Sequence, residues 1–230
     1  VYSSALKPIG SSYTSKTVDV FRGEVKDVSL DSATQEEIDN TIAVMGGEDW
    51  EMWIDFLAEQ NLLAKGVKTI AYSYIGPALT HAVYKNGTIG KAKDHLKQTS
   101  DKLNQKLKAS HQGEAVISIN KGVVTQASSA IPVVPLYFAI LFKVMKEQGT
   151  HEGCIEQIYR LFHDHLYTAH PVARDQEGMI RVDDLEMKPE VQELIAQVWP
   201  TVTTENLMQL TDIEGYRNEF YRLFGFNLPG

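Results

Sequence analysis

Two apolar segments separated by a long helical pattern constrain the fold more than any other feature of the sequence. Residues 67–75 and 115–125 are short, apolar and rich in β-branched or aromatic side chains, as buried strands are. Residues 88–110, which lie between them, carry apolar side chains at helical spacing. A strand, a helix and a second strand in this order form a right-handed βαβ unit. We therefore expect an α/β protein in which the two strand ends lie side by side.

The residues after the first strand have the chemistry of a reactive site. Gly76-Pro77 ends the strand, because glycine is flexible and proline lacks a backbone donor. Tyr84 and Lys93 follow, so a phenol and an ammonium group arrive near the carboxyl end of a strand. In open parallel sheets this edge is where ligands bind, which makes both groups candidates for work on a substrate.

The spacing of Tyr84 and Lys93 can be compared with helix geometry. On one continuous helix they would lie on opposite faces. Asn86-Gly87 favours a turn between them, and Thr88 could then be the N-cap of the helix. Tyr84 would lie in the loop and Lys93 one to two turns inside the helix. Composition alone also allows Tyr84 in the core and Lys93 on a solvated helix face.

The other segments predict a hairpin and several helices. Thr34 and Glu37 have the form of a capping box, and Gly46-Gly47 should end that helix in a left-handed conformation. The apolar helix over residues 131–145 is a candidate wall for an acyl chain. We expect a hairpin over residues 17–30 and helices over residues 34–44, 50–63, 127–147, 151–167, 189–198, 203–210 and 216–224. On the last of these, Tyr216, Phe220, Leu223 and Phe224 should form one packing face.

Charge and cysteine content exclude several classes of function. A formal net charge of −8 argues against a general binder of nucleic acid or of anionic membranes. The longest apolar run, residues 130–142, is too short to span a bilayer, and we expect no membrane anchor. The single cysteine, Cys154, fits a reducing compartment such as the cytoplasm and should be a buried structural thiol. His163 and His165 face different directions on a helix, so we expect no metal site there.

Three segments resemble one known family. They are Tyr72-Ser-Tyr-Ile-Gly-Pro77, the pair Tyr84 and Lys93 with eight residues between them, and Val124-Thr-Gln-Ala-Ser-Ser-Ala-Ile-Pro132. Together they resemble the bacterial trans-2-enoyl-CoA reductases, which include the FabV-type enoyl-ACP reductases. Ordinary short-chain dehydrogenases have only three residues between the tyrosine and the lysine. The resemblance extends along nearly the whole chain.

The resemblance implies a fold and an activity. The fold would be a Rossmann-like, doubly wound parallel sheet with extra helices, equivalent to the C-terminal part of a short-chain-dehydrogenase-like fold. The activity would be NADH-dependent reduction of the trans-2 double bond of enoyl thioesters, carried by acyl carrier protein or coenzyme A, in fatty acid synthesis. Tyr84 and Lys93 would be catalytic and Tyr74 would contact the substrate. Lys93, Val123, Val124 and Thr125 would bind the cofactor, NADH or NAD.

The resemblance also implies a division of the chain. Residues 1–167 would be the catalytic portion of the reductase domain and residues 168–230 a C-terminal helical subdomain. Family members carry a glycine-rich phosphate-binding loop before this region, and no GxGxxG sequence occurs in these 230 residues. We therefore expect an N-terminal half of the same enzyme as a partner, and a monomer when the enzyme is complete. The alternative is a noncatalytic fragment that binds an acyl group or a nucleotide.

Overall fold

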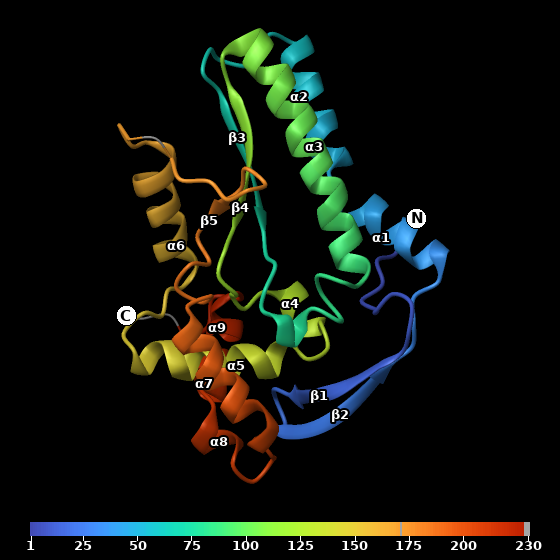
Figure 1. Ribbon diagram of the computed structural model, residues 1–230, viewed down its shortest axis with the longest axis vertical. Helices are drawn as coiled ribbons and strands as arrows, with labels where there is room; N and C mark the ends of the chain where they lie inside the picture. The colour runs from blue at the N-terminus through green and yellow to red at the C-terminus, as the bar shows by residue number, and fades with distance from the viewer. Residues whose placement is uncertain (171, 228–230) are drawn as a thin grey trace.

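A computed structural model describes residues 1–170 and 172–227. The central feature is a parallel sheet of three strands in the order β3-β4-β5 (Figure 1). A separate antiparallel hairpin is formed by β1 and β2. The strands are β1 (Tyr13–Asp19), β2 (Glu24–Leu30), β3 (Lys68–Ser73), β4 (Glu114–Ile119) and β5 (Ile180–Arg181).

The predicted strand, helix and second strand are confirmed as β3, α3 (Thr88–His111) and β4. The two strands pair in parallel, from Lys68 with Glu114 to Ser73 with Ile119. Both are shorter than predicted. The N–H of Asn120 still donates to the carbonyl of Ser73, but the next N–H donates to a glutamine side chain, so the pairing ends there.

Helices cover both faces of the sheet, as in a Rossmann-like α/β fold. Side chains of β4 alternate between the faces, because successive residues of a strand point in opposite directions. Val116 packs against η2 (Leu161–Leu166), a π-helical turn that continues α6 (Cys154–Arg160). Ile117 and Ala115 face α3 on the other side. Figure 1 shows α2 (Glu48–Glu59) and α3 along one side of the sheet and α6 on the other.

The largest apolar core surrounds α5 (Val134–Glu147), which lies across the carboxyl end of the sheet. This helix is buried on nearly all sides because its sequence is apolar around its circumference. The C-terminal helices pack on it and complete the same core. They are α7 (Pro189–Val198), α8 (Leu207–Leu210) and α9 (Ile213–Arg222).

The other described elements are two helices and two 3₁₀ turns: α1 (Gln35–Met45), α4 (Gln126–Ala130), η1 (Ala78–Thr80) and η3 (Trp199–Thr201).

Several predicted helix bounds are wrong. The helix predicted over residues 127–147 is divided into α4 and α5, because Pro132 and a left-handed Val133 interrupt it. The helix predicted over residues 151–167 begins only at Cys154 and becomes π-helical. Only four residues of the helix predicted over 203–210 are helical, as α8. The helix predicted over residues 50–63 begins two residues earlier and ends at Glu59.

Three predictions about single residues are also wrong. Gly46 is extended rather than left-handed, and glycine is needed there because a Cβ would lie 2.5 Å from the carbonyl oxygen of Ile42. Thr88 is the first helical residue rather than the N-cap, since its hydroxyl bonds to the carbonyl of Ala5. Cys154 is exposed, not buried.

The packing face predicted on the last helix is only partly formed. Tyr216 is buried and Phe220 packs against the core, but Leu223 and Phe224 are 47% and 48% exposed because α9 ends at Arg222. The capping box of Thr34 and Glu37 is confirmed.

Candidate functional site

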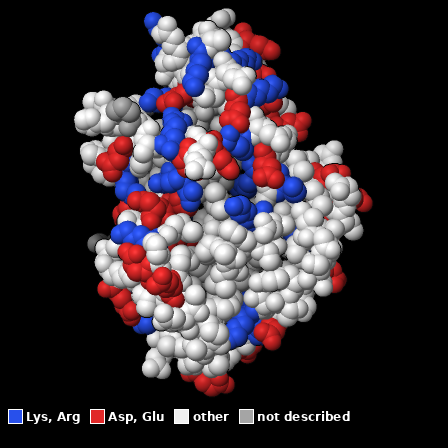
Figure 2. Space-filling model, viewed as in Figure 1, with Lys and Arg blue, Asp and Glu red and all other residues white. Residues whose placement is uncertain are grey.

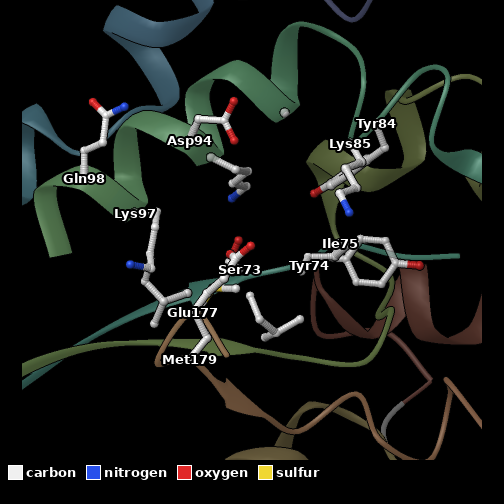
Figure 3. A pocket seen from close by; sticks show the side chains of 14 residues that line it. Ser73, Tyr74, Ile75, Tyr84, Lys85, Asp94, Lys97, Gln98, Glu177 and Met179 are labelled. Carbon is white, nitrogen blue, oxygen red and sulfur yellow. The ribbon is translucent and has the colours of Figure 1, made fainter. Parts of the chain in front are cut away.

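A cavity of about 470 Å³ opens at the carboxyl end of β3, between the sheet and the first turns of α3. Both predicted catalytic residues and Tyr74 line it, together with apolar side chains from β4 and from the segment after β3 (Figure 3). The lining residues are Ser73, Tyr74, Ile75, Tyr84, Lys85, Gly90, Lys93, Asp94, Lys97, Gln98, Ile117, Ile119, Glu177 and Met179.

Tyr84 lies in the loop between η1 and α3, as predicted. Its N–H donates to the carbonyl of Thr80, and its own carbonyl accepts from the N–H groups of Gly87 and Gly90. Glycine is required at position 90 because a Cβ there would overlap the carbonyl of Lys85. The side chain is only 8% exposed. Figure 3 shows its hydroxyl pointing into the cavity.

Lys93 reaches the same cavity from the second turn of α3. Burial lowers the pKa of Lys93 from its usual value. Burial also raises the pKa of Tyr84 to about 12. In the part of the chain that the structure describes, neither the hydroxyl nor the ammonium group has a hydrogen-bond partner.

Tyr74 presents its ring, and not its hydroxyl, to the cavity. The hydroxyl donates a 2.8 Å hydrogen bond to Oε1 of Glu186, and Figure 3 shows it pointing away from the cavity. The ring lies edge-on to Tyr84, with 5.2 Å between the centroids and 79° between the planes. The same ring packs edge-on against Phe138 of α5. Tyr74 is therefore a wall that supports Tyr84.

The predicted cofactor-binding residues after β4 do not line this cavity. Val124 is buried in the core around α5, and Thr125 is exposed. The Thr125 hydroxyl accepts a 2.9 Å hydrogen bond from the N–H of Ser128 and caps α4. Val123 lies beside them, at the same edge of the sheet as Tyr84 and Lys93.

Sequence reasoning missed a buried polar cluster behind the cavity. Glu186 is fully buried, and its carboxylate accepts hydrogen bonds from Tyr74, Tyr137 and the backbone N–H of Gly122. Lys121 is also buried, which lowers its pKa to about 8; its ammonium group lies 4.7 Å from the centre of the Phe142 ring. A charged residue directly after an apolar strand was a signal for Lys121. Nothing in the sequence around Glu186 indicates its role.

Charges of both signs line the cavity. Its lining contains three lysines and two carboxylates, while the whole chain has a formal charge of −8. Lys97 is paired with Asp101. Figure 2 shows basic side chains gathered with acidic ones over the part of the molecule that contains α3 and the sheet. Lys85 and Lys93, which have no carboxylate partner among the described residues, suit a ligand with anionic groups.

The apolar surface of the cavity comes from the sheet and from Met179. None of its lining residues belongs to α5, which is buried against the C-terminal helices. The hypothesis that the apolar helix forms a wall for the acyl chain requires α5 to line this cavity. The structure does not place it there.

Within residues 1–170 and 172–227, no group of three His, Cys, Asp or Glu side chains could hold a metal ion. His163 is exposed and its Nδ1 contacts the carboxylate of Asp164. No helix in residues 1–170 and 172–227 is both long and apolar enough to cross a membrane.

The parallel sheet with helices on both faces, and the tyrosine and lysine in one cavity at its carboxyl edge, define a Rossmann-like α/β protein with a ligand site at the usual edge. Comparison with protein families makes this specific. Residues 1–167 match the model of the trans-2-enoyl-CoA reductase catalytic region, and residues 174–230 match that of the enoyl reductase FAD binding domain. The chain belongs to the trans-2-enoyl-CoA reductase family.

Curated relatives are similar along the whole chain. An enoyl-[acyl-carrier-protein] reductase [NADH] of Coxiella burnetii is 55% identical over 230 residues, which are 100% of this chain and 57% of the relative. A trans-2-enoyl-CoA reductase [NADH] of Clostridium perfringens is 56% identical, with 100% and 58% covered. This chain thus spans less than two thirds of the length of these relatives.

Solved structures of two relatives have the same fold. The trans-2-enoyl-CoA reductase of Clostridium acetobutulicum in complex with NADH superposes with a TM-score of 0.96 at 43% identity, covering 100% of this chain and 57% of that one. The Treponema denticola trans-2-enoyl-CoA reductase in complex with NAD gives a TM-score of 0.94 at 50% identity, with 100% and 57% covered.

The family name of residues 174–230 includes FAD. Helices α7, α8 and α9 place Val191, Leu207 and Tyr216 in the core around α5. Among the described residues of this segment, only Glu177 and Met179 line the cavity described above.

Proposed function

We propose that this chain carries the reacting groups of an NADH-dependent reductase, and that the whole enzyme reduces the trans-2 double bond of enoyl thioesters in fatty acid synthesis. One observation carries the proposal: the Tyr84 hydroxyl and the Lys93 ammonium group share a cavity, and neither has a partner in the described residues. An enzyme commonly keeps such donors free for the substrate.

The residues around the cavity fit a nicotinamide cofactor. Lys93 supplies a positive charge and hydrogen-bond donors for the ribose hydroxyls. Val123, Val124 and Thr125 follow β4 at the same sheet edge, where their backbone groups and the Thr125 hydroxyl would contact the nicotinamide half. The phosphates would be held by the part of the enzyme that lies outside this chain, since no GxGxxG sequence occurs within it.

Tyr84 acts on the charge that develops during reduction. NADH, when bound, supplies a hydride that adds to the β-carbon of the enoyl thioester. Negative charge then develops on the thioester oxygen, and the Tyr84 hydroxyl donates a hydrogen bond to it. Because burial raises the pKa of Tyr84 to about 12, the phenol keeps its proton near neutral pH and is able to donate. A proton added at the α-carbon completes the saturated thioester.

Tyr74 keeps its role as a substrate-contacting residue, but through its ring. Its hydroxyl is held by Glu186, so the ring edge is the part available to the acyl group. Ile75, Ile117 and Met179 supply further apolar surface for the acyl chain. The relatives carry both the acyl-carrier-protein and the coenzyme A names, and the proposal includes either carrier.

The whole enzyme would combine this chain with an N-terminal half and function as a monomer in the cytoplasm. The rival hypothesis is a noncatalytic fragment that binds an acyl group or a nucleotide. The two differ in what a full-length protein does with NADH and a crotonyl thioester. A noncatalytic protein would bind one of them without consuming NADH.

Replacement of Tyr84 tests the proposed function. In a full-length enzyme that contains this chain, Tyr84→Phe should lower kcat for crotonyl thioester by at least about a hundredfold, as loss of one oxyanion donor commonly does. The matched control is Tyr159→Phe, because Tyr159 is 67% exposed on α6, away from the cavity. It should leave kcat unchanged. Near-normal turnover of Tyr84→Phe would remove Tyr84 from the mechanism.

A further inference from the structure

The buried carboxylate of Glu186 connects three parts of the fold. Oε1 accepts hydrogen bonds from the hydroxyls of Tyr74 at 2.8 Å and Tyr137 at 2.7 Å. Oε2 accepts from the backbone N–H of Gly122 at 2.7 Å. These partners belong to the end of β3, to α5 and to the loop after β4. Glu186 itself comes from the C-terminal segment, 112 residues from Tyr74.

The hydrogen bonds in this cluster have defined directions when Glu186 is ionised. An ionised carboxylate only accepts, so both tyrosine hydroxyls then direct their protons at Glu186. Gln192 donates its side-chain amide to the hydroxyl oxygen of Tyr137 and to the backbone carbonyl of Glu186. The chain of bonds from Gln192 through Tyr137 to Glu186 is therefore satisfied at each step. This arrangement holds Glu186 in one orientation.

A fully buried carboxylate is costly unless it is well bonded. Burial raises the pKa of Glu186, and the positive charge of nearby Lys121 acts against this. An apolar side chain could fill the same space without a loss of stability, because replacing buried ionic groups by apolar ones is often neutral or stabilising. The carboxylate is bonded directly to Tyr74, which lines the cavity, and this contact points to a use for it.

The connection to the cavity passes through Tyr74. Its hydroxyl is held by Glu186, and its ring lies edge-on to the ring of Tyr84. If the hydroxyl were released, the ring could rotate and the wall behind Tyr84 would move. The bond to Gly122 holds the start of the loop that leads to residues 123–125.

We propose that Glu186 is a positioning residue: its carboxylate fixes the Tyr74 ring behind Tyr84 and so aligns the phenol of Tyr84 in the cavity. Glu186 acts through Tyr74 and does not touch the reacting atoms. The inference rests on the proposed function, because alignment of Tyr84 matters only if Tyr84 acts on a substrate.

The test is a double-mutant cycle between Glu186→Gln and Tyr74→Phe in a full-length enzyme. Glutamine has the same shape, but one of its two ends is a donor and must face either the tyrosine hydroxyls or the N–H of Gly122. We expect Glu186→Gln to lower kcat for crotonyl thioester by about tenfold or more, as small misplacements of a reacting group do. Its KM for the thioester should change by less than about twofold.

The cycle separates positioning from a general structural role. If Glu186 acts through Tyr74, Glu186→Gln should change kcat by less than about twofold when Tyr74→Phe is already present. The matched control is Asp183→Asn, since Asp183 is another buried carboxylate of the same segment and bonds only to Arg181 among the described side chains. Asp183→Asn should lower the denaturant midpoint and leave kcat unchanged.

Several results would overturn the proposal. One is a normal kcat for Glu186→Gln, and another is an equal loss with and without the Tyr74 hydroxyl. If Glu186→Gln does not fold, Tyr74→Phe alone decides: a normal kcat would show that the bond to Glu186 does not align the site. An inactive wild-type enzyme would instead refute the proposed function. The unfolding midpoints would then test the bond between Glu186 and Tyr74. The double variant should lose less unfolding free energy than the sum of the losses in the two single variants.

Discussion

Gly122 should tolerate no side chain, because it lies against the buried ring of Phe138. A Cβ at this position would lie 2.4 Å from Cε1 and 2.8 Å from Cζ of that ring, whereas ordinary contacts begin near 3.4 Å. Gly122→Ala therefore requires the ring edge to retreat by about 1 Å. Phe138 is only 2% exposed and packs against Tyr74, Tyr137 and Phe142, so there is little room for it to move.

The expected cost of Gly122→Ala is about 1–3 kcal/mol in the free energy of unfolding, the usual range for an overpacked core. The displaced ring would also press on Tyr74, which supports Tyr84. We therefore expect a loss of kcat together with the loss of stability. Phe138→Leu alone also destabilises, because it leaves a cavity. In the double variant the two changes should compensate by at least about 1 kcal/mol, since the smaller side chain makes room for the Cβ.

The assay is denaturant unfolding of the full-length enzyme and its two single variants and double variant. Gly153→Ala serves as a control, because its φ is −84° and its added Cβ meets only the end of the flexible Glu156 side chain. It should cost no more than about 1 kcal/mol, the usual effect of alanine at an N-cap. If Gly122→Ala is no worse than Gly153→Ala, or if its cost simply adds to that of Phe138→Leu, the contact between Gly122 and Phe138 does not constrain the site.

Two further predictions concern stability. Burial lowers the pKa of His151 to about 4 from 6.5. The contribution of the neutral side chain to stability is therefore complete above pH 6.5 and is lost as the pH falls through 4. His151→Phe should flatten the dependence of the unfolding free energy on pH over that window, and an unchanged pH dependence would assign the loss of stability to another group. Thr125→Ala should lower the free energy of unfolding by about 1 kcal/mol because it removes the cap of α4, while Thr125→Ser should keep the cap and the stability. Equal unfolding free energies for the two variants would show that the cap contributes nothing.

Local patterns in the sequence were sufficient for the centre of the fold. The strand, helix and strand around α3 are visible because apolar periodicity and turn residues agree along this stretch. The same patterns placed Tyr84 in a loop and Lys93 inside the helix. The capping box of Thr34 and Glu37 needs only residues three apart, and it was also predicted correctly.

Contacts between distant segments were not predictable in this way. The Thr88 hydroxyl bonds to Ala5, 83 residues away, so the local capping argument failed there. Glu186 reaches Tyr74 across 112 residues, and no periodicity relates the two. Leu223 and Phe224 had the spacing of a core face but lie beyond the end of α9 and are about half exposed; Phe224 contacts only the edge of the core, through the ring of Phe220. Burial of polar groups depends on tertiary structure, which is why the cluster around Glu186 was missed.

Transfer of deuterium from labelled NADH most directly tests the claim that Tyr84 and Lys93 serve an enoyl reductase. A full-length enzyme that contains this chain would be mixed with crotonyl thioester and NADH deuterated at the transferred position, and the product analysed by NMR and mass spectrometry. The account predicts one deuterium at the β-carbon and an α-hydrogen from solvent, with transfer slowed at least about a hundredfold in Tyr84→Phe. Unlabelled product, deuterium at the α-carbon, or equal transfer by Tyr84→Phe would contradict it.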